Sequence, residues 1–267
     1  MPDQFSTAVL ERDGLRVHTF TAPPSFLANS THVLETAEAL VVIDGQFVAP
    51  YAKAFREYVN SLQKPIERVY LSHAHVDHWF GLSTAFADVP VHAAAPTIAA
   101  LQRHGESERA ARAAEYGPMV PASMVLPSVT VLPGPDVVDG VKLEVEIVEA
   151  AECEAQLLLT LPDHGVTVAQ DLVYSGTHVY VTRDTAHTIS LLDILEASAS
   201  DVFLAGHGPV ADRAEVHRNI DYLAFAQDRL ANDDAAAFKA ALLARFPDRA
   251  CPELLDIFIP RLFGGSS

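Results

Sequence analysis

Residues 72–78 read SHAHVDH and place three histidines and one aspartate within six positions. An apolar, strand-like segment precedes them at residues 66–71. Neutral imidazoles and a carboxylate are the ligands that zinc and similar ions prefer. Grouping so many ionisable side chains costs desolvation free energy unless a partner offsets it, and one bound cation is a partner for all of them. A solvated histidine-rich loop is the alternative interpretation, but such loops rarely follow a buried strand in this order.

The spacing inside this stretch indicates two metal positions rather than one. His73 and His75 are two residues apart, so on an extended segment their side chains point the same way. Asp77 and His78 follow a predicted change of direction, where the chain enters a helix. We therefore expect the second pair to face a position beside the one that the first pair occupies.

The His-x-His-x-Asp-His pattern resembles the signature of the metallo-β-lactamase superfamily, whose members mostly bind two metals. The resemblance implies an α/β fold, the αββα four-layer sandwich, with ligands on loops at one sheet edge. Three positions outside this stretch, one before it and two after it, also match the family. Asp44, after a strand-like run at 41–43, matches a residue that supports a ligand from behind, although a plain turn residue is the alternative. Asp171 matches the bridging carboxylate, and His207, in a Gly-His-Gly turn, matches the last histidine ligand.

One ligand position departs from the usual family pattern. Most members carry a histidine about twenty residues before the bridging aspartate, and counting back from Leu161 places Glu152 there. A glutamate at this position resembles the alkylsulfatase branch of the superfamily. We expect Glu152 to be a ligand of the first metal, with Glu154 and Cys153 as local alternatives. On an extended segment Cys153 points opposite to Glu152. For Cys153 we therefore favour a small buried residue over a ligand.

The resemblance implies a complete site and a reaction. His73, His75 and Glu152 hold one metal, Asp77, His78 and His207 hold the other, and Asp171 spans both. A hydroxide that bridges the metals is then the nucleophile, with Asp77 orienting it or taking its proton. Tyr174 and His178 follow the bridging aspartate and are further catalytic candidates as donors to a developing oxyanion. The alternative for Tyr174 is core packing, and for His178 a surface loop.

The expected activity is hydrolysis of a small-molecule ester-type bond, such as that of a lactone, thioester or sulfate ester. Two divalent ions are implied, most simply Zn²⁺, but the extra carboxylate of Glu152 favours harder ions such as Mn²⁺ or Fe²⁺. One alternative is a metal-binding regulatory protein without turnover. Another is the di-iron redox branch of the family, which usually has a glutamate at the position of His75 and an attached flavin domain; this chain shows neither.

Composition narrows the range of partners. The chain carries 18 basic against 35 acidic residues, a formal charge of −17. Nonspecific nucleic-acid binding relies on clustered Lys and Arg, so the balance argues against nucleic acid and against anionic membrane surfaces. The two cysteines do not make a disulfide framework. The N-terminus lacks the pattern of a secretory signal, and no apolar run approaches membrane-spanning length. We expect a cytoplasmic protein.

The pattern of apolar residues predicts two strand-rich halves around a proline-rich joint at residues 118–135. We assign residues 1–210 to the sandwich domain and residues 211–267 to a helical extension that packs on it, with pairing to a second subunit as the alternative. Helices are expected at 51–62 and 96–116. Strands are expected at 15–20, 32–35, 39–43, 68–71, 91–93, 128–132, 141–148, 156–161, 166–169 and 201–204.

Overall fold

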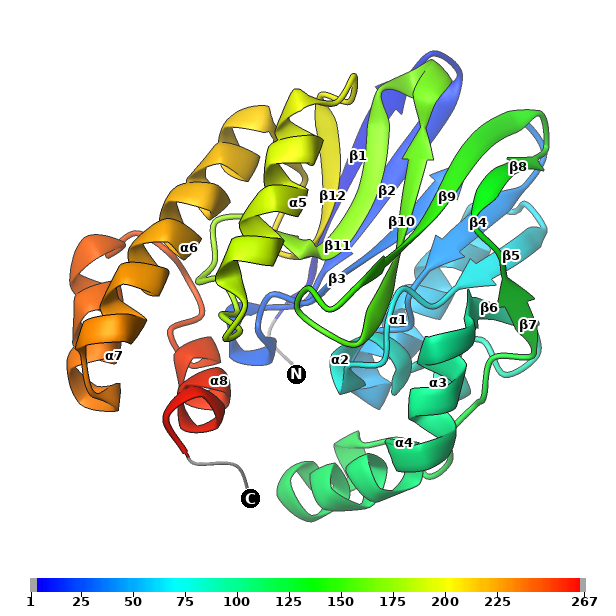
Figure 1. Ribbon diagram of the computed structural model, residues 1–267. Helices are drawn as coiled ribbons and strands as arrows, with labels where there is room; N and C mark the ends of the chain where they lie inside the picture. The colour runs from blue at the N-terminus through cyan, green and yellow to red at the C-terminus, as the bar shows by residue number, and fades with distance from the viewer. Residues whose placement is uncertain (1–3, 265–267) are drawn as a thin grey trace.

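The computed structural model describes residues 4–264, and within that range the chain forms two β-sheets covered by helices on both outer faces (Figure 1). The first sheet has seven strands, which lie in chain order. They are β1 (Ser6–Arg12), β2 (Leu15–Thr21), β3 (Ser30–Glu35), β4 (Leu40–Ile43), β5 (Ile66–Tyr70), β6 (Val91–Ala94) and β7 (Val129–Val131). The strands β1 to β4 pair antiparallel, and β4 to β7 pair parallel.

The second sheet has six strands in the order β13-β12-β11-β10-β9-β8. Only the β11–β12 pair is parallel among its described pairs. The proline-rich joint contains β7, and the chain crosses from the first sheet to the second at residues 132–133, between β7 and β8. The strands are β8 (Gly134–Val138), β9 (Val141–Glu149), β10 (Ala155–Leu161), β11 (Val166–Tyr174), β12 (Val202–His207) and β13 (Ala211–Asp212).

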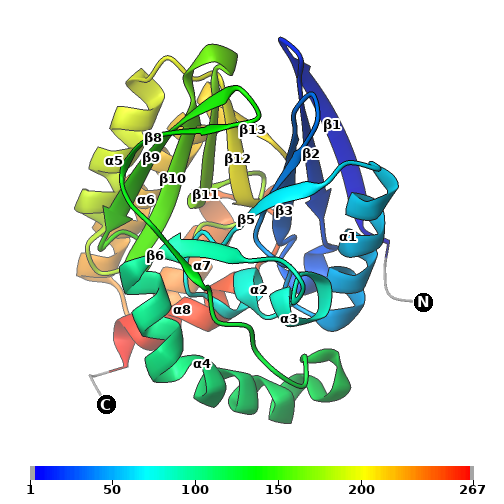
Figure 2. The same cartoon turned by 90° about the vertical axis from the view of Figure 1, so that its right-hand side faces the viewer.

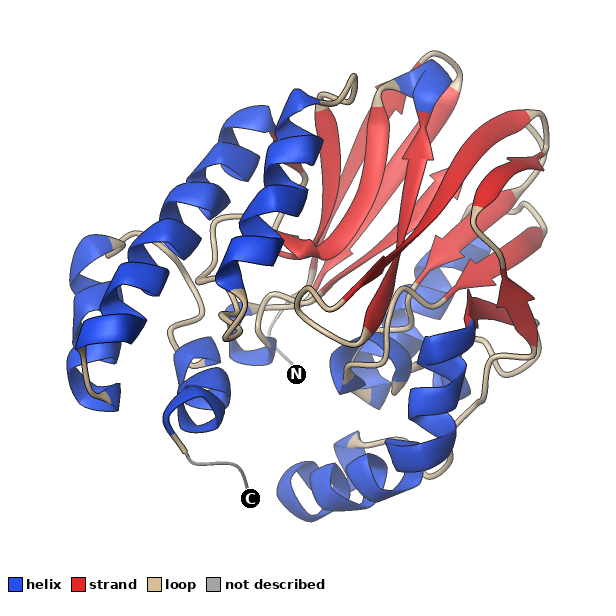
Figure 3. Cartoon of the chain, in the orientation of Figure 1, coloured by secondary structure: helices blue, strands red, loops and turns tan. Residues whose placement is uncertain are grey.

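Three apolar cores separate the layers, which is the arrangement expected of an αββα sandwich. One core lies between the two sheets and includes Val41 and Leu159. Another joins the first sheet to α1 (Ala49–Ser61) through residues such as Phe55. The third joins the second sheet to α5 (Thr185–Ala197) and α6 (Arg213–Asn232) through residues such as Phe203. Figure 3 shows the helices on both outer faces of the strands. The predicted fold class is confirmed.

Two further helices complete the tail, α7 (Ala235–Arg245) and α8 (Leu254–Phe263). Their apolar residues, including Phe238 and Phe258, belong to the same core as α5, α6 and the second sheet. Three of these helices begin at an aspartate whose side chain accepts a hydrogen bond from the backbone N–H three residues on: Asp184, Asp212 and Asp234. No helix of residues 4–264 is long and apolar enough to cross a membrane.

The remaining helices lie at the end of the sheets where the histidine-rich stretch emerges (Figures 1 and 2). They are α2 (Val76–Trp79), α3 (Leu82–Ala85) and α4 (Ala95–Tyr116). Short 3₁₀ turns occupy Pro24–Phe26, Gly117–Met119 and Pro162–His164. In Figure 1, α4 and α8 both lie below the sheets, on opposite sides of this end of the molecule.

The sequence pattern missed β1, β8, β13, α3 and α5 and misplaced the end of β11. β1 and β8 are edge strands with few buried residues, β13 and α3 are very short, and the apolar residues of α5 show little helical periodicity. β11 was expected to end at residue 169 but continues to Tyr174. Its pairing with β12 shifts register between Val168 and Gln170 and again before Tyr174. These irregularities let the strand carry Asp171 within its length rather than after its end.

Candidate metal centre

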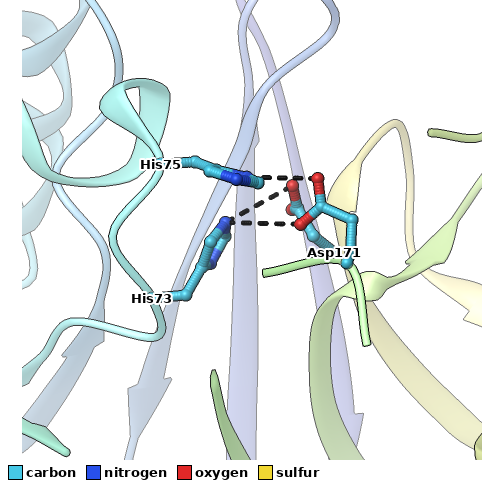
Figure 4. Close-up of side chains that lie close together, drawn as sticks. His73, His75 and Asp171 are labelled. Carbon is cyan, nitrogen blue, oxygen red and sulfur yellow. Dashed lines mark ion pairs between the residues drawn. The ribbon is translucent and has the colours of Figure 1, made fainter. Parts of the chain in front are cut away.

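The histidine-rich stretch sits where β5 ends, in a short loop that leads into α2. His75 has extended backbone angles and caps the N-terminus of α2, so Asp77 and His78 belong to the helix itself. This change from extended to helical backbone turns the second pair away from the first, as the spacing predicted. In Figure 4 the imidazole of His73 points toward the carboxylate of Asp171, and that of His75 lies beside it.

The first ligand group combines two imidazoles with two carboxylates: His73, His75, Glu152 and Asp171. Nδ1 of His75 lies 3.1 Å from Oε1 of Glu152, and Nε2 of His73 lies 3.9 Å from its Oε2. Glu152 comes from the loop between β9 and β10 and is 8% exposed. The structure thus brings the unusual glutamate to the histidines, as the register from Leu161 predicted. Its neighbour Glu154 instead pairs with Arg103 on the surface.

The second ligand group consists of Asp77, His78 and His207. Nε2 of His207 lies 3.4 Å from Oδ2 of Asp77, and Nε2 of His78 lies 3.7 Å from the same oxygen. His207 is the last residue of β12, and its Nδ1 donates to the backbone carbonyl of Leu27 at 2.8 Å. That hydrogen bond leaves Nε2 free to bind a cation.

Asp171 lies between the two groups. Its Oδ2 is 3.5 Å from Nε2 of His73 and 3.4 Å from Nε2 of His207, and its Oδ1 is 3.1 Å from Nε2 of His78. The backbone of Gly206 passes so close that an added Cβ would lie 1.8 Å from Oδ1 of Asp171. A glycine is therefore required beside the carboxylate that spans the site.

Asp44 holds the histidines from behind and is fully buried. Its carboxylate accepts from Nδ1 of His78 at 2.8 Å, from the backbone N–H and the hydroxyl of Ser72 at 2.7 Å each, and from the side-chain amide of Gln170. Ser72 in turn lies 2.9 Å from Nδ1 of His73. These contacts direct Nε2 of both histidines toward Asp171. The plain-turn interpretation of Asp44 does not account for this network.

The electrostatics show what the protein without bound cations must balance. Burial disfavours the charged form of His75, but Glu152, Asp171 and Asp77 outweigh it and raise its pKa to about 9. Burial likewise opposes ionisation of Asp171, yet the surrounding histidines hold its pKa well below the usual value. The carboxylates of this cluster therefore favour positive charge beside them.

The donor set also fits divalent cations by the test of unsatisfied polar atoms. Four buried ligand atoms have no hydrogen-bond partner among residues 4–264: Nε2 of His73, Nε2 of His78, Oε2 of Glu152 and Oδ1 of Asp171. Buried polar groups are normally paired, because an unpaired one costs free energy. Atoms left unpaired in a converging set of imidazoles and carboxylates are what a metal site presents.

A pocket of about 320 Å³ opens onto the ligands. Its floor includes His75, Asp77, Glu152, Asp171 and His207. One wall comes from the face of α4 that carries Leu101, Gly105 and Arg112, and the opposite wall comes from α8 through Leu254, Ile257 and Arg261. The tail therefore contributes directly to the site, and no sequence signal had linked it to the metal ligands.

Of the two other catalytic candidates, Tyr174 lines the pocket and His178 does not. Tyr174 lines the pocket, stacks on His207 with ring centroids 5.0 Å apart, and its hydroxyl donates to Asp171 at 3.2 Å. His178 does not line the pocket; it is 1% exposed, and its Nδ1 bonds the hydroxyl of Tyr222 at 2.9 Å. His178 therefore lies away from the pocket, because its ring is buried against Tyr222 of α6, and this burial also rules out the surface-loop alternative.

Sequence reasoning also missed Tyr180. Its ring lines the pocket at a centroid distance of 6.0 Å from that of His75. Its hydroxyl accepts a hydrogen bond from Nη1 of Arg261 at 2.8 Å, across 81 positions of sequence. A lone tyrosine in a loop carries no motif, so only the folded chain reveals this contact.

Solved structures with the same architecture include both hydrolase types that the ligand pattern suggests. A metallo-β-lactamase from Pontibacter korlensis matches with a TM-score of 0.63 and 18% identity, over 83% of this chain and 99% of that one. The mono-zinc metallo-β-lactamase FIM-1 from Pseudomonas aeruginosa matches with a TM-score of 0.62 and 15% identity, over 85% and 97%. The inverting sec-alkylsulfatase Pisa1 from Pseudomonas sp. matches with a TM-score of 0.68 and 20% identity.

The alkylsulfatase match covers 97% of this chain but only 51% of that protein, so this chain spans about half its length. No curated protein matches the sequence. The model of the metallo-beta-lactamase superfamily matches residues 25–207, a range that holds every predicted metal ligand. With the two-sheet sandwich and the converging ligands in place, the chain belongs to the metallo-beta-lactamase superfamily.

Proposed function

We propose that this protein is a metal-dependent hydrolase that cleaves an ester-type bond of a small molecule at a two-metal centre. The observation that carries the proposal is the pair of adjacent ligand groups, joined by Asp171 at the floor of a pocket. His73, His75, Glu152 and Asp171 would hold the first ion, and Asp77, His78 and His207, with Asp171, the second. The open side of the site faces the pocket, which distinguishes a catalytic from a closed structural site.

When bound, two divalent ions would lower the pKa of the attacking water and place positive charge beside the substrate's oxygens. The protein's own residues do the rest. Asp77 belongs to the second ligand group and also lines the pocket. Its carboxylate can therefore orient the attacking water and accept its proton. Burial, with Asp171 adding to it, raises the pKa of Tyr174 well above its ordinary value, so its hydroxyl stays protonated and donates to Asp171, the carboxylate that joins the two groups.

Zinc is the ion we favour, since the superfamily fold and the histidine-rich donor set suit it. Glu152 adds a negative charge where most members have a neutral imidazole. That substitution favours the harder ions Mn²⁺ and Fe²⁺ at the first position more than an all-histidine set does.

The substrate class follows from the pocket and from Glu152. A cavity of about 320 Å³, whose helical walls combine apolar residues such as Leu101 and Ile257 with charged ones such as Arg112, suits a small molecule with an apolar part and a polar group. The glutamate resembles the alkylsulfatase branch, which places sulfate esters beside lactones and thioesters as candidate substrates. We propose no nucleic-acid substrate, because the chain is strongly acidic.

The test is metal analysis of the purified protein together with a substrate panel of sulfate, phosphate, lactone, thioester and β-lactam compounds. The proposal predicts two ions per chain and turnover of at least one ester-type compound. Full metal content without turnover of any member would instead favour a regulatory metal-binding protein. Iron together with a visible flavin spectrum would favour the redox branch.

A further inference from the structure

Tyr180 is held between the metal ligands and the C-terminal helix. Its ring lies 6.0 Å from that of His75 and 5.3 Å from that of Phe258 in α8, measured between centroids. The side chain of Tyr180 also lines the pocket, beside the first ligand group.

The contact with Arg261 decides which way that hydroxyl hydrogen can point. A guanidinium has only donors, so Nη1 of Arg261 donates and the oxygen of Tyr180 accepts, at 2.8 Å. Among residues 4–264 nothing accepts the hydrogen of the Tyr180 hydroxyl in return. Since the side chain lines the pocket, the hydrogen is available to whatever the pocket holds.

Tyr174 offers an instructive contrast inside the same pocket. Its hydroxyl donates to Asp171 at 3.2 Å, so its hydrogen already has an acceptor in the protein. Tyr180 has a donor from the protein and needs an acceptor from elsewhere. The donor comes from α8, which lies beyond residues 25–207, the part of the chain that matches the family model.

We propose that Tyr180 is a substrate-binding residue that donates its hydroxyl hydrogen to an oxygen of the reacting group, and that Arg261 is a positioning residue that directs this hydrogen. The proposal rests on the hydrolase function proposed above. It identifies the substrate as one whose reacting group carries an accessible oxygen beside the bond that is cleaved, such as an acyl or sulfuryl oxygen. The C-terminal helix then takes part in recognition rather than only covering the sandwich.

The test compares Tyr180→Phe, Arg261→Met and Arg261→Lys, with Arg245→Met as the control for loss of an arginine elsewhere in the tail. A hydrogen bond to a charged or developing-charge oxygen predicts a tenfold to hundredfold lower kcat/KM for Tyr180→Phe at unchanged metal content. Arg261→Met should lose about three- to tenfold, and Arg261→Lys should recover most of that loss. In the Tyr180→Phe background, Arg261→Met should cost nothing further, since it acts through the missing hydroxyl.

A binding measurement separates this inference from the hydrolase proposal. Inorganic phosphate is titrated into the metal-loaded protein by calorimetry, which needs no turnover. If no substrate in the panel is cleaved, the hydrolase proposal fails, while a tenfold or greater weakening of phosphate binding in Tyr180→Phe still supports the donor role. Phosphate affinity and kcat/KM that are unchanged in Tyr180→Phe, or a loaded wild type that binds no phosphate, would overturn the inference. Equal losses from Arg261→Met in both backgrounds would overturn the role of Arg261.

Discussion

The two ligand groups of the metal centre differ in how firmly the fold holds them. The second group is braced from behind, because His78 donates to the buried Asp44 and His207 donates to the carbonyl of Leu27. In the first group, the side chain of His75 is 30% exposed, and its nearest acidic neighbour is Glu152, from a loop. The comparison teaches that both histidines of the second position are hydrogen-bonded from behind, whereas the first position depends in part on a loop carboxylate.

The largest expected effect comes from removing the residue that joins the two groups. Asp171→Ala takes a ligand from both positions and leaves the surrounding histidines without their main counter-charge. We expect metal content to fall from two ions per chain to less than one and hydrolysis to fall to background, as measured by elemental analysis and by assay. Asp163→Ala, which breaks a surface pair with Lys142, is the control and should change neither.

The difference between the groups is tested most sharply by Glu152→Ala. This change should remove the first ion, leave the second in place and keep the fold, so that metal content falls from two ions to one. Circular dichroism and elemental analysis report the two outcomes separately. Glu154→Ala is a matched control two residues away, because Glu154 is exposed and pairs with Arg103. Full occupancy in Glu152→Ala would refute the assignment of Glu152 as a ligand.

The support behind the second group should have a smaller but measurable effect. Asp44→Asn removes the charge that orients His78 and, through Ser72, His73. Loss of such a supporting carboxylate typically costs tenfold to a hundredfold in metal affinity. Competition with a chromophoric chelator measures the change, and Asp139→Asn, at an exposed turn, serves as the control. An unchanged affinity would mean that α2 and β12 hold the ligands of the second group in place without Asp44.

The motif and the fold class could be predicted from the sequence because both depend on residues that are close together along the chain. Residues 72–78 carry their spacing within one loop, and the alternation of strands and helices fixes the layers. Glu152 was found from its register with Leu161, which works because β10 is short and regular. The residues that line the pocket could not be predicted in this way, because they come from segments far apart in the sequence. Arg261 and Tyr180 meet only after the tail has packed on the second sheet, and no pattern in either segment records the contact.

His178 is a residue for which the position in the sequence suggested a role that the structure does not support. Its position shortly after Asp171 suggested catalysis, yet burial, with the nearby Arg249 adding to it, lowers its pKa to about 4. This is opposite to His75, whose pKa the ligand carboxylates raise to about 9. The pKa values of the two histidines are therefore shifted in opposite directions, because their neighbours in space differ.

The last expected effect lies outside the metal centre and tests that structural role. Because His178 is neutral when folded but takes up a proton near pH 6.5 when unfolded, stability should fall as the pH drops from 6.5 toward 4 and should lose no more from this group below that. The contribution is up to about 3 kcal/mol. His178→Asn should flatten the profile of unfolding free energy over this range, as measured by urea denaturation, whereas the exposed His217→Asn should not. Parallel profiles for wild type and His178→Asn would contradict the buried, neutral assignment.

The most direct test of the central claim is an anomalous-scattering map of crystals grown from metal-loaded protein. The account predicts two peaks about 3.5–4 Å apart, the first contacted by His73, His75 and Glu152, the second by Asp77, His78 and His207, and both by Asp171. A map with no peak among these side chains, or with one ion held without Asp171, would contradict it.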